Sequence, residues 1–101
     1  MHISRLLFHT VPGKTGRVEH ELKNLRDMVT AVGEIRARIL HTDFVSLGAS
    51  DAVFEQEASD LPTLEPQISK LTSGADFQAW SQRMSALLIQ SPTREIYIVT
   101  D

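Results

Sequence analysis

The fold is decided by residues 34–58, which read EIRARILHTDFVSLGASDAVFEQEA. Apolar and polar residues alternate over residues 34–44 and again over residues 52–58, as they do in strands with one buried face. The turn-forming run SLGAS at residues 46–50 separates the two segments, so the stretch predicts a β-hairpin. With the turn centred near residue 47 or 48, arginines of the first strand face glutamates of the second, which is a favourable cross-strand pairing. These residues are Arg36, Arg38, Glu55 and Glu57.

A strand is also predicted near each end of the chain, because residues 3–11 read ISRLLFHTV and residues 94–100 read REIYIVT. An amphipathic helix is predicted after the first of these strands. We expect Thr15 or Gly16 to cap the N-terminus of this helix, and Gly33 to end it in the left-handed conformation. The apolar stripe of the helix consists of Val18, Leu22, Leu25, Met28, Val29 and Val32.

Prolines and a capping motif divide the region between the hairpin and the last strand. A proline breaks a helix interior, so we expect Thr63 to cap a short helix that has Pro66 in its first turn and ends near Leu71. Residues 73–76, Ser-Gly-Ala-Asp, have the form of a capping box and predict the start of a second helix, which the Ser-Pro pair at residues 91–92 is expected to end. The apolar stripe of that helix is Phe77, Trp80, Met84, Leu87 and Leu88.

The predicted element order is therefore β-α-β-β-α-β. Two right-handed crossovers in this order interleave as a ferredoxin-like α+β fold, with a four-stranded antiparallel sheet and the helices on one face. The first and last strands are then neighbours in the sheet. A chain of 101 residues has room for one core, so residues 1–101 are expected to form a single domain. The face toward the helices is expected to be the more apolar one, with Leu6, Phe8, Ile35, Ala37, Ile39, Ala52, Phe54, Ile96 and Ile98.

The opposite face of the sheet is expected to mix apolar and charged residues. A contiguous apolar patch on an exposed face usually marks an interaction site, whereas so many charged groups do not suit a dry core. Packing against a second copy around a two-fold axis accommodates both, so we expect a homodimer. The apolar members are Leu7, Leu40, Val53, Tyr97 and Val99, and the charged members are Arg5, Arg36, Arg38, Glu55, Glu57 and Glu95.

Composition argues against several classes of function. The net charge of −3 argues against a nucleic-acid partner, since nucleic-acid-binding proteins usually carry a basic field. The absence of cysteine excludes disulfides and thiolate catalysis, and no pair of histidines has metal-ligand spacing on one predicted element, so no metal is expected. No apolar run approaches the roughly 20 residues that span a bilayer, and no signal peptide is apparent. We therefore expect a cytoplasmic protein without a membrane partner.

Several different short motifs are distributed along most of the chain. They are PGK at residues 12–14 before an amphipathic helix, TD at residues 42–43 at a strand end, and DL at residues 60–61 at the start of a split helix. Together they resemble the dimeric α+β barrel superfamily. The runs FQAW at residues 77–80 and REIY at residues 94–97 are similar to its NIPSNAP branch in particular. The resemblance implies two ferredoxin-like subunits with their sheets face to face, and a cleft between the helices and the sheet or at the barrel interior.

This resemblance leaves the activity open, because one fold hosts many functions. Relatives in the superfamily include cofactor-free monooxygenases of polyketide quinones, haem-degrading enzymes and proteins with no known activity. The haem-degrading branch implies an Asn, a Trp and a His around the tetrapyrrole. Here Asn24 lies on the polar face of a helix, and the second helical region contains no histidine. We therefore expect no haem, and no other cofactor is indicated.

Our main hypothesis is a NIPSNAP-like homodimer of undetermined activity that binds a small flat or apolar molecule, at the sheet/helix cleft or the barrel interior. The alternative is a cofactor-independent monooxygenase acting on phenolic or quinone-type substrates, in which His9 and Tyr97 orient the substrate. A third hypothesis is a regulatory or structural module, since amino-acid-binding ACT-like domains share the topology. Fusion to a larger enzyme would be expected for such a module.

The candidate ligand-binding residues each have a structural explanation as well. His9 is expected near Arg38 and Glu55, where its imidazole is either a general base or ligand anchor, or a group hydrogen-bonded across the dimer. Arg5, Arg38 and Glu55 either bind an anionic substrate or pair with one another, and the pattern favours pairing. Trp80 either roofs a pocket for a flat ligand or belongs to the core, which is commoner. The complete candidate set is Arg5, His9, Arg38, Glu55, Trp80 and Tyr97.

Overall fold

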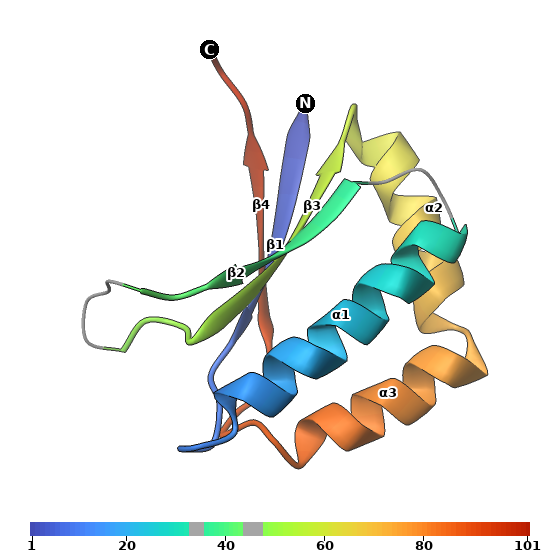
Figure 1. Ribbon diagram of the computed structural model, residues 1–101. Helices are drawn as coiled ribbons and strands as arrows, with labels where there is room; N and C mark the ends of the chain where they lie inside the picture. Colours follow the sequence, from blue (N-terminus) through green and yellow to red (C-terminus); the bar gives the residue numbers. More distant parts are fainter. Residues whose placement is uncertain (33–35, 44–47) are drawn as a thin grey trace.

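The computed structural model describes residues 1–32, 36–43 and 48–101, which form a four-stranded antiparallel sheet with helices packed on one face (Figure 1). The strands lie in the order β2-β3-β1-β4, so the first and last strands are neighbours, as predicted. This arrangement confirms the ferredoxin-like α+β fold, with the second helical region divided into two helices. The elements are β1 (His2–Phe8), α1 (Thr15–Val32), β2 (Arg36–His41), β3 (Ala52–Ala58), α2 (Leu61–Thr72), α3 (Ala75–Ser85) and β4 (Thr93–Ile98).

The hairpin of β2 and β3 has the predicted register. Arg36 lies opposite Glu57, and Arg38 lies opposite Glu55. On the other side of β3, Arg5 of β1 also lies opposite Glu55. Because side chains alternate across a strand, all five residues belong to the sheet face that looks away from the helices, which we call the outer face.

The terminal strands are shorter than predicted. β1 ends at Phe8 rather than at residue 11, and β4 ends at Ile98 rather than at residue 100. β2 ends at His41, short of the predicted end at residue 44, because residues 42 and 43 are not part of the strand. Its predicted start, at residue 34, lies outside the described residues. So do the Gly33 cap and the first part of the predicted turn.

The core lies between the sheet and α1. This helix runs across β2 and β3, and α2 and α3 pack against it (Figure 1). Burying a large apolar side chain contributes roughly 1.5–3 kcal/mol, so this layer is the main source of stability. The largest fully buried apolar side chains are Phe8, Leu22, Leu25, Phe54 and Leu64.

The helices cover less of the sheet than the sequence predicts. The register places Ile96 and Ile98 on the helix side of β4, where we expected them to be covered. Instead their side chains are 47% and 65% exposed. The physical reason is the position of β4 at the edge of the sheet: α1 packs on β2 and β3, and α2 packs on β3, so the helical layer stops before β4.

The start of α1 differs by one residue from the expected cap. Thr15 is itself the first helical residue, and the carbonyl of Lys14 accepts a hydrogen bond from the Val18 N–H at 3.0 Å. The Thr15 hydroxyl instead lies 2.8 Å from the hydroxyl of Thr10, so it ties the helix start to the end of β1.

The predicted start of the next helix is wrong. Asp60, not Thr63, caps α2, and its carboxylate accepts a hydrogen bond from the Thr63 N–H at 2.8 Å. Pro66 therefore lies inside the helix, where it cannot donate a backbone hydrogen bond to Pro62. The Asp60 cap and the complete burial of Leu64 hold this segment helical in spite of the lost bond.

The predicted capping box is also wrong. Gly74 is the N-cap of α3 and makes no side-chain capping bond. Ser73 instead ends α2, because only two residues separate the helices and the Ser73 hydroxyl donates to the Lys70 carbonyl at 3.1 Å. The helix then ends at Ser85, well before the Ser-Pro pair at residues 91–92. The predicted apolar stripe is confirmed on the helix itself, where Trp80 and Met84 are buried and Phe77 is partly buried. Leu87 and Leu88, the last two residues of the predicted stripe, lie beyond the end of α3.

Candidate functional site

A cleft of about 360 Å³ lies between the sheet and α3, and we call it the α3 cleft. Buried apolar side chains from β1 and α3 line it, and exposed polar side chains lie around them. Its lining residues come from one strand, one helix and the segment that joins α3 to β4. They are Phe8, Trp80, Ser81, Met84, Ser85, Leu88, Ile89, Gln90, Ser91 and Pro92.

The segment after α3 shapes this cleft by means of a bulge. Beyond the end of β1, the Ile89 N–H donates to the His9 carbonyl at 3.0 Å, and the Val11 N–H donates to the Leu87 carbonyl at 2.9 Å. Regular pairing resumes only at Thr93, which lies opposite Leu7. Two residues on the β1 side, 8 and 9, therefore face four on the other side, 89–92. Such bulges interrupt a ladder and turn a strand aside, which here places residues 89–92 along the cleft.

Trp80 is held in one position at the cleft. Its ring is buried, and its indole N–H donates to the Glu21 carbonyl of α1 at 2.6 Å. Phe77 packs beside it, with ring centroids 5.4 Å apart and an interplanar angle of 31°. On the same helix, Arg83 binds Glu21 through Nε at 2.9 Å. The indole donor and the Arg83 charge are therefore both used to join α3 to α1.

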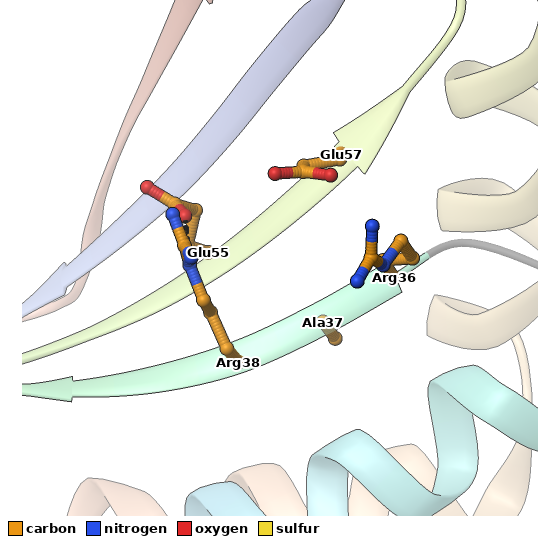
Figure 2. A pocket seen from close by; sticks show the side chains of 5 residues that line it. All are labelled: Arg36, Ala37, Arg38, Glu55 and Glu57. Atoms are coloured by element: carbon orange, nitrogen blue, oxygen red, sulfur yellow. Dashed lines mark hydrogen bonds and ion pairs between the residues drawn. The ribbon is translucent and has the colours of Figure 1, made fainter.

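The outer face carries a different kind of site, which we call the Glu55 cluster and which consists of Arg5, Arg38 and Glu55. The Glu55 side chain is 0% exposed, and each of its carboxylate oxygens accepts a hydrogen bond from one arginine. The Arg5 Nε atom lies 2.8 Å from Oε1, and the Arg38 Nε atom binds Oε2. Figure 2 shows Arg38 and Glu55 reaching toward each other across neighbouring strands.

Two opposed effects set the charge of Glu55. Burial raises the pKa of its carboxyl. The hydrogen bonds and charges of Arg5 and Arg38 together lower this pKa by more than burial raises it, so the pKa lies below its ordinary value. The carboxylate is therefore ionised at neutral pH and matched by two cations.

The hollow beside this cluster is small. It measures about 190 Å³ and is lined by Arg36, Ala37, Arg38, Glu55 and Glu57 (Figure 2). Sites for small molecules are typically about 300–1,000 Å³, so this hollow is smaller than a typical ligand site. Its arginines and glutamates face one another in register, which supports pairing over the binding of an anionic substrate.

Tyr97 lies beside the Glu55 cluster on β4. The Arg5 guanidinium carbon is 5.3 Å from the centroid of its ring. Its hydroxyl donates to Glu95 at 2.5 Å, and this bond, together with some desolvation, raises the pKa of Tyr97 above its ordinary value. The phenol therefore stays protonated at neutral pH and is oriented along the surface of β4.

His9 does not lie beside Arg38 and Glu55, as the sequence predicted. Glu55 pairs with Arg5, and His9 is four residues further along the extended chain, which corresponds to roughly 13 Å. The His9 Nε2 atom lies 3.2 Å from the Gly48 carbonyl oxygen instead. Tyr97 pairs with Ile3, six residues from His9 and roughly 20 Å away by the same measure. One small phenol in one subunit does not reach both groups.

The structure thus divides the candidate residues among three places. Arg5, Arg38, Glu55 and Tyr97 come together on the outer face. Trp80 borders the α3 cleft on the helix side, and His9 lies at the loop end of the hairpin, beside Gly48. Sequence reasoning missed the polar residues of the cleft. The spacing of Ser81 and Ser85, one helical turn apart and each directly after an apolar stripe residue, is a signal that could have indicated them. The missed residues are Ser81, Ser85, Gln90 and Ser91.

Within residues 1–32, 36–43 and 48–101, no group of three or more His, Asp or Glu side chains is placed to hold a metal ion. In the same part of the chain, no helix combines the length and apolarity needed to cross a bilayer.

Comparisons with known proteins identify the fold. No model of a known protein family and no curated protein matches the chain. Solved structures do match it over nearly its full length. An uncharacterised NIPSNAP domain protein from Burkholderia xenovorans is 16% identical with a TM-score of 0.79, and the match covers 99% of this chain and 95% of that one. A NIPSNAP family protein from Agrobacterium tumefaciens is 17% identical with a TM-score of 0.76, over 99% of this chain and 86% of that one.

A third similar structure has a name that refers to an activity. A protein from Nitrosomonas europaea, named for antibiotic biosynthesis monooxygenases, is 11% identical with a TM-score of 0.70, and the match covers 98% of both chains. Identities this low establish the fold and do not transfer an activity. The chain therefore has the ferredoxin-like α+β fold that these NIPSNAP and monooxygenase-named structures share.

Proposed function

We propose that this protein is a homodimer in which each subunit binds a small flat or apolar molecule in the α3 cleft. The observation that carries the proposal is the cleft itself. Its volume of about 360 Å³ lies in the range of small-molecule sites, and its floor is formed by the buried side chains of Phe8, Trp80 and Met84. An aromatic and thioether floor favours flat apolar molecules, because rings stack and sulfur packs well against them.

The outer face supports the dimer. Leu7, Val53 and Leu40 lie side by side on β1, β3 and β2, and all three are only partly buried. Partly exposed apolar residues of this kind, beside the ion-paired Glu55 cluster, favour a partner that covers them. A second copy brings the same mixture of apolar groups and balanced charges, as a two-fold interface requires.

Ligand binding is tested with 2-naphthol and protein labelled with ¹⁵N. Trp80 is the only tryptophan in the chain, so its indole N–H gives a single signal at the edge of the cleft. We expect 2-naphthol to shift this signal in a saturable way. Ser81→Phe places a ring at the cleft and is expected to weaken binding at least tenfold.

The matched control is Ser69→Phe, because Ser69 is exposed on α2 and does not line the cleft. This variant is expected to bind 2-naphthol as the parent does. Equal weakening by both substitutions, or no saturable shift with the parent protein, contradicts the proposed binding site.

The homodimer is tested by Val53→Glu, which places a negative charge at the centre of the apolar strip between Leu7 and Leu40. An unpaired charge buried in an interface costs several kcal/mol, so we expect the dissociation constant of the dimer to rise at least tenfold. Sedimentation equilibrium measures this change, and circular dichroism checks that the monomer is folded. Ser69→Glu, on exposed α2, is expected to leave the mass unchanged. A weak dimer with an association free energy of about −7 kcal/mol has a dissociation constant of roughly 10 μM, so it would be mostly assembled at a protein concentration of about 100 μM. A parent protein that sediments as a monomer at that concentration disproves the dimer.

A further inference from the structure

We infer that the α3 cleft selects electrically neutral ligands, namely an apolar ring system that carries an uncharged hydroxyl or carbonyl group. This inference rests on the proposed function and names the class of ligand. The residues that line the cleft all lie in the described part of the chain. None of them is an Asp, Glu, His, Lys or Arg.

The charged groups nearest to the cleft in the chain are directed elsewhere. Arg83 of α3 uses its Nε and a terminal nitrogen to bind Glu21 of α1, at 2.9 Å and 3.3 Å. His9 contributes its backbone carbonyl to the bulge at Ile89, while its Nε2 atom lies at the Gly48 carbonyl.

Arg94 follows Pro92 by two residues, but its Nη1 donates to the Ser4 hydroxyl at 2.7 Å, and Ser4 lies four residues from Phe8 along β1, roughly 13 Å away. The residues that line the cleft therefore supply no counter-charge for an ionised ligand and no side-chain acid or base.

An ion in such a cleft loses hydration without gaining a partner. Desolvating an unpaired charge is far more costly than desolvating a neutral hydroxyl or amide, which needs only a hydrogen bond. The cleft provides neutral hydrogen-bonding groups for that purpose in Ser81, Ser85 and Gln90. Ser85 already donates to the Gln82 carbonyl at 2.9 Å, so its oxygen can still accept a hydrogen bond from a ligand.

The arrangement of these groups also orients the ligand. The indole N–H of Trp80 is committed to the Glu21 carbonyl, so the buried floor offers no free donor from this residue. The neutral hydrogen-bonding side chains, Ser81, Ser85 and Gln90, are exposed at the mouth. The apolar end of the ligand therefore lies against Phe8, Trp80 and Met84, and its polar end lies at the mouth.

A matched pair of probes tests the inference. 2-Naphthamide and 2-naphthoate have the same ring and nearly the same shape, but only the second is ionised at pH 7. Binding is measured by isothermal titration calorimetry and by the indole signal of Trp80. We expect the amide to bind at least tenfold more tightly than the carboxylate. Ser81→Lys, which supplies a cation at the mouth, is expected to reduce this preference at least threefold.

The control for the added charge is Gln78→Lys, because Gln78 is exposed on the same helix and does not line the cleft. It is expected to keep the parent's preference. If naphthoate binds as tightly as naphthamide, or if Gln78→Lys changes the preference as much as Ser81→Lys does, the inference is overturned and the proposed binding site stands. If neither probe, nor 2-naphthol, binds the parent protein, both are overturned.

Discussion

The double substitution Arg5→Met and Arg38→Met is expected to lower the free energy of unfolding by about 3–5 kcal/mol. Both arginines bind the carboxylate of Glu55, whose side chain is fully buried. Removing them leaves an uncompensated charge inside the sheet, which is the costly way to break a buried ion pair. Urea unfolding at one fixed protein concentration measures the loss, since the stability of any protein that self-associates depends on its concentration.

The control adds Glu55→Leu to the double variant. Because the buried charge is then gone, we expect the triple variant to recover most of the lost stability. Removal of Glu55 alone is expected to cost less than removal of both arginines, since Arg5 and Arg38 are 40% and 63% exposed and can be hydrated. A triple variant no more stable than the double one shows that the arginines act through packing and not through the charge of Glu55.

The parent and the double variant Arg5→Met/Arg38→Met are expected to respond oppositely to acid. In the parent, the pKa of Glu55 is lowered on folding, so its contribution is complete above the ordinary value of 4.5 and is lost as the pH falls through the folded-state pKa. In the double variant only burial acts, so the pKa of Glu55 is raised and its ionised form destabilises the fold. The difference in stability between the two proteins should therefore shrink as the pH is lowered from 7 to 4. A constant difference contradicts this account.

The substitution Trp80→Ala is expected to lower the free energy of unfolding by about 3–5 kcal/mol, the usual cost of removing a buried aromatic side chain. Trp80 contributes more than its area, because its indole N–H binds the Glu21 carbonyl and its ring packs beside Phe77. Loss of these contacts also removes one of the ties between α3 and α1. Thermal or urea unfolding measures the change.

Two further variants separate these contributions. Trp80→Phe keeps most of the apolar volume and loses the hydrogen bond to Glu21, so it is expected to cost clearly less than Trp80→Ala. Gln82→Ala changes an exposed side chain on the same helix and is expected to alter stability by at most about 0.5 kcal/mol. A Trp80→Ala protein as stable as the Gln82→Ala protein contradicts the assignment of Trp80 to the core.

Local elements were predictable where a short-range pattern has one physical meaning. The alternation over β2 and β3 has period two, which permits only one assignment of residues to faces, and the charges on one face specify the partner of each residue. Thus the pairing of Arg38 with Glu55 follows from the sequence. The start of α2 did not, because Asp60 and Thr63 are both good caps, and the choice depends on how deeply Leu64 is buried.

The sequence by itself determined the order of the elements, the two faces of the sheet and the pairing of Arg38 with Glu55, because these depend on periodicity and on neighbours across a short hairpin. Only the tertiary structure decided where the α3 cleft lies. The α3 cleft is formed by Phe8 of β1, Trp80 of α3 and the bulge at residues 89–92, which are brought together by long-range packing. Likewise the exposure of Ile98 depends on how far the helices extend over the sheet, and no local pattern specifies that extent.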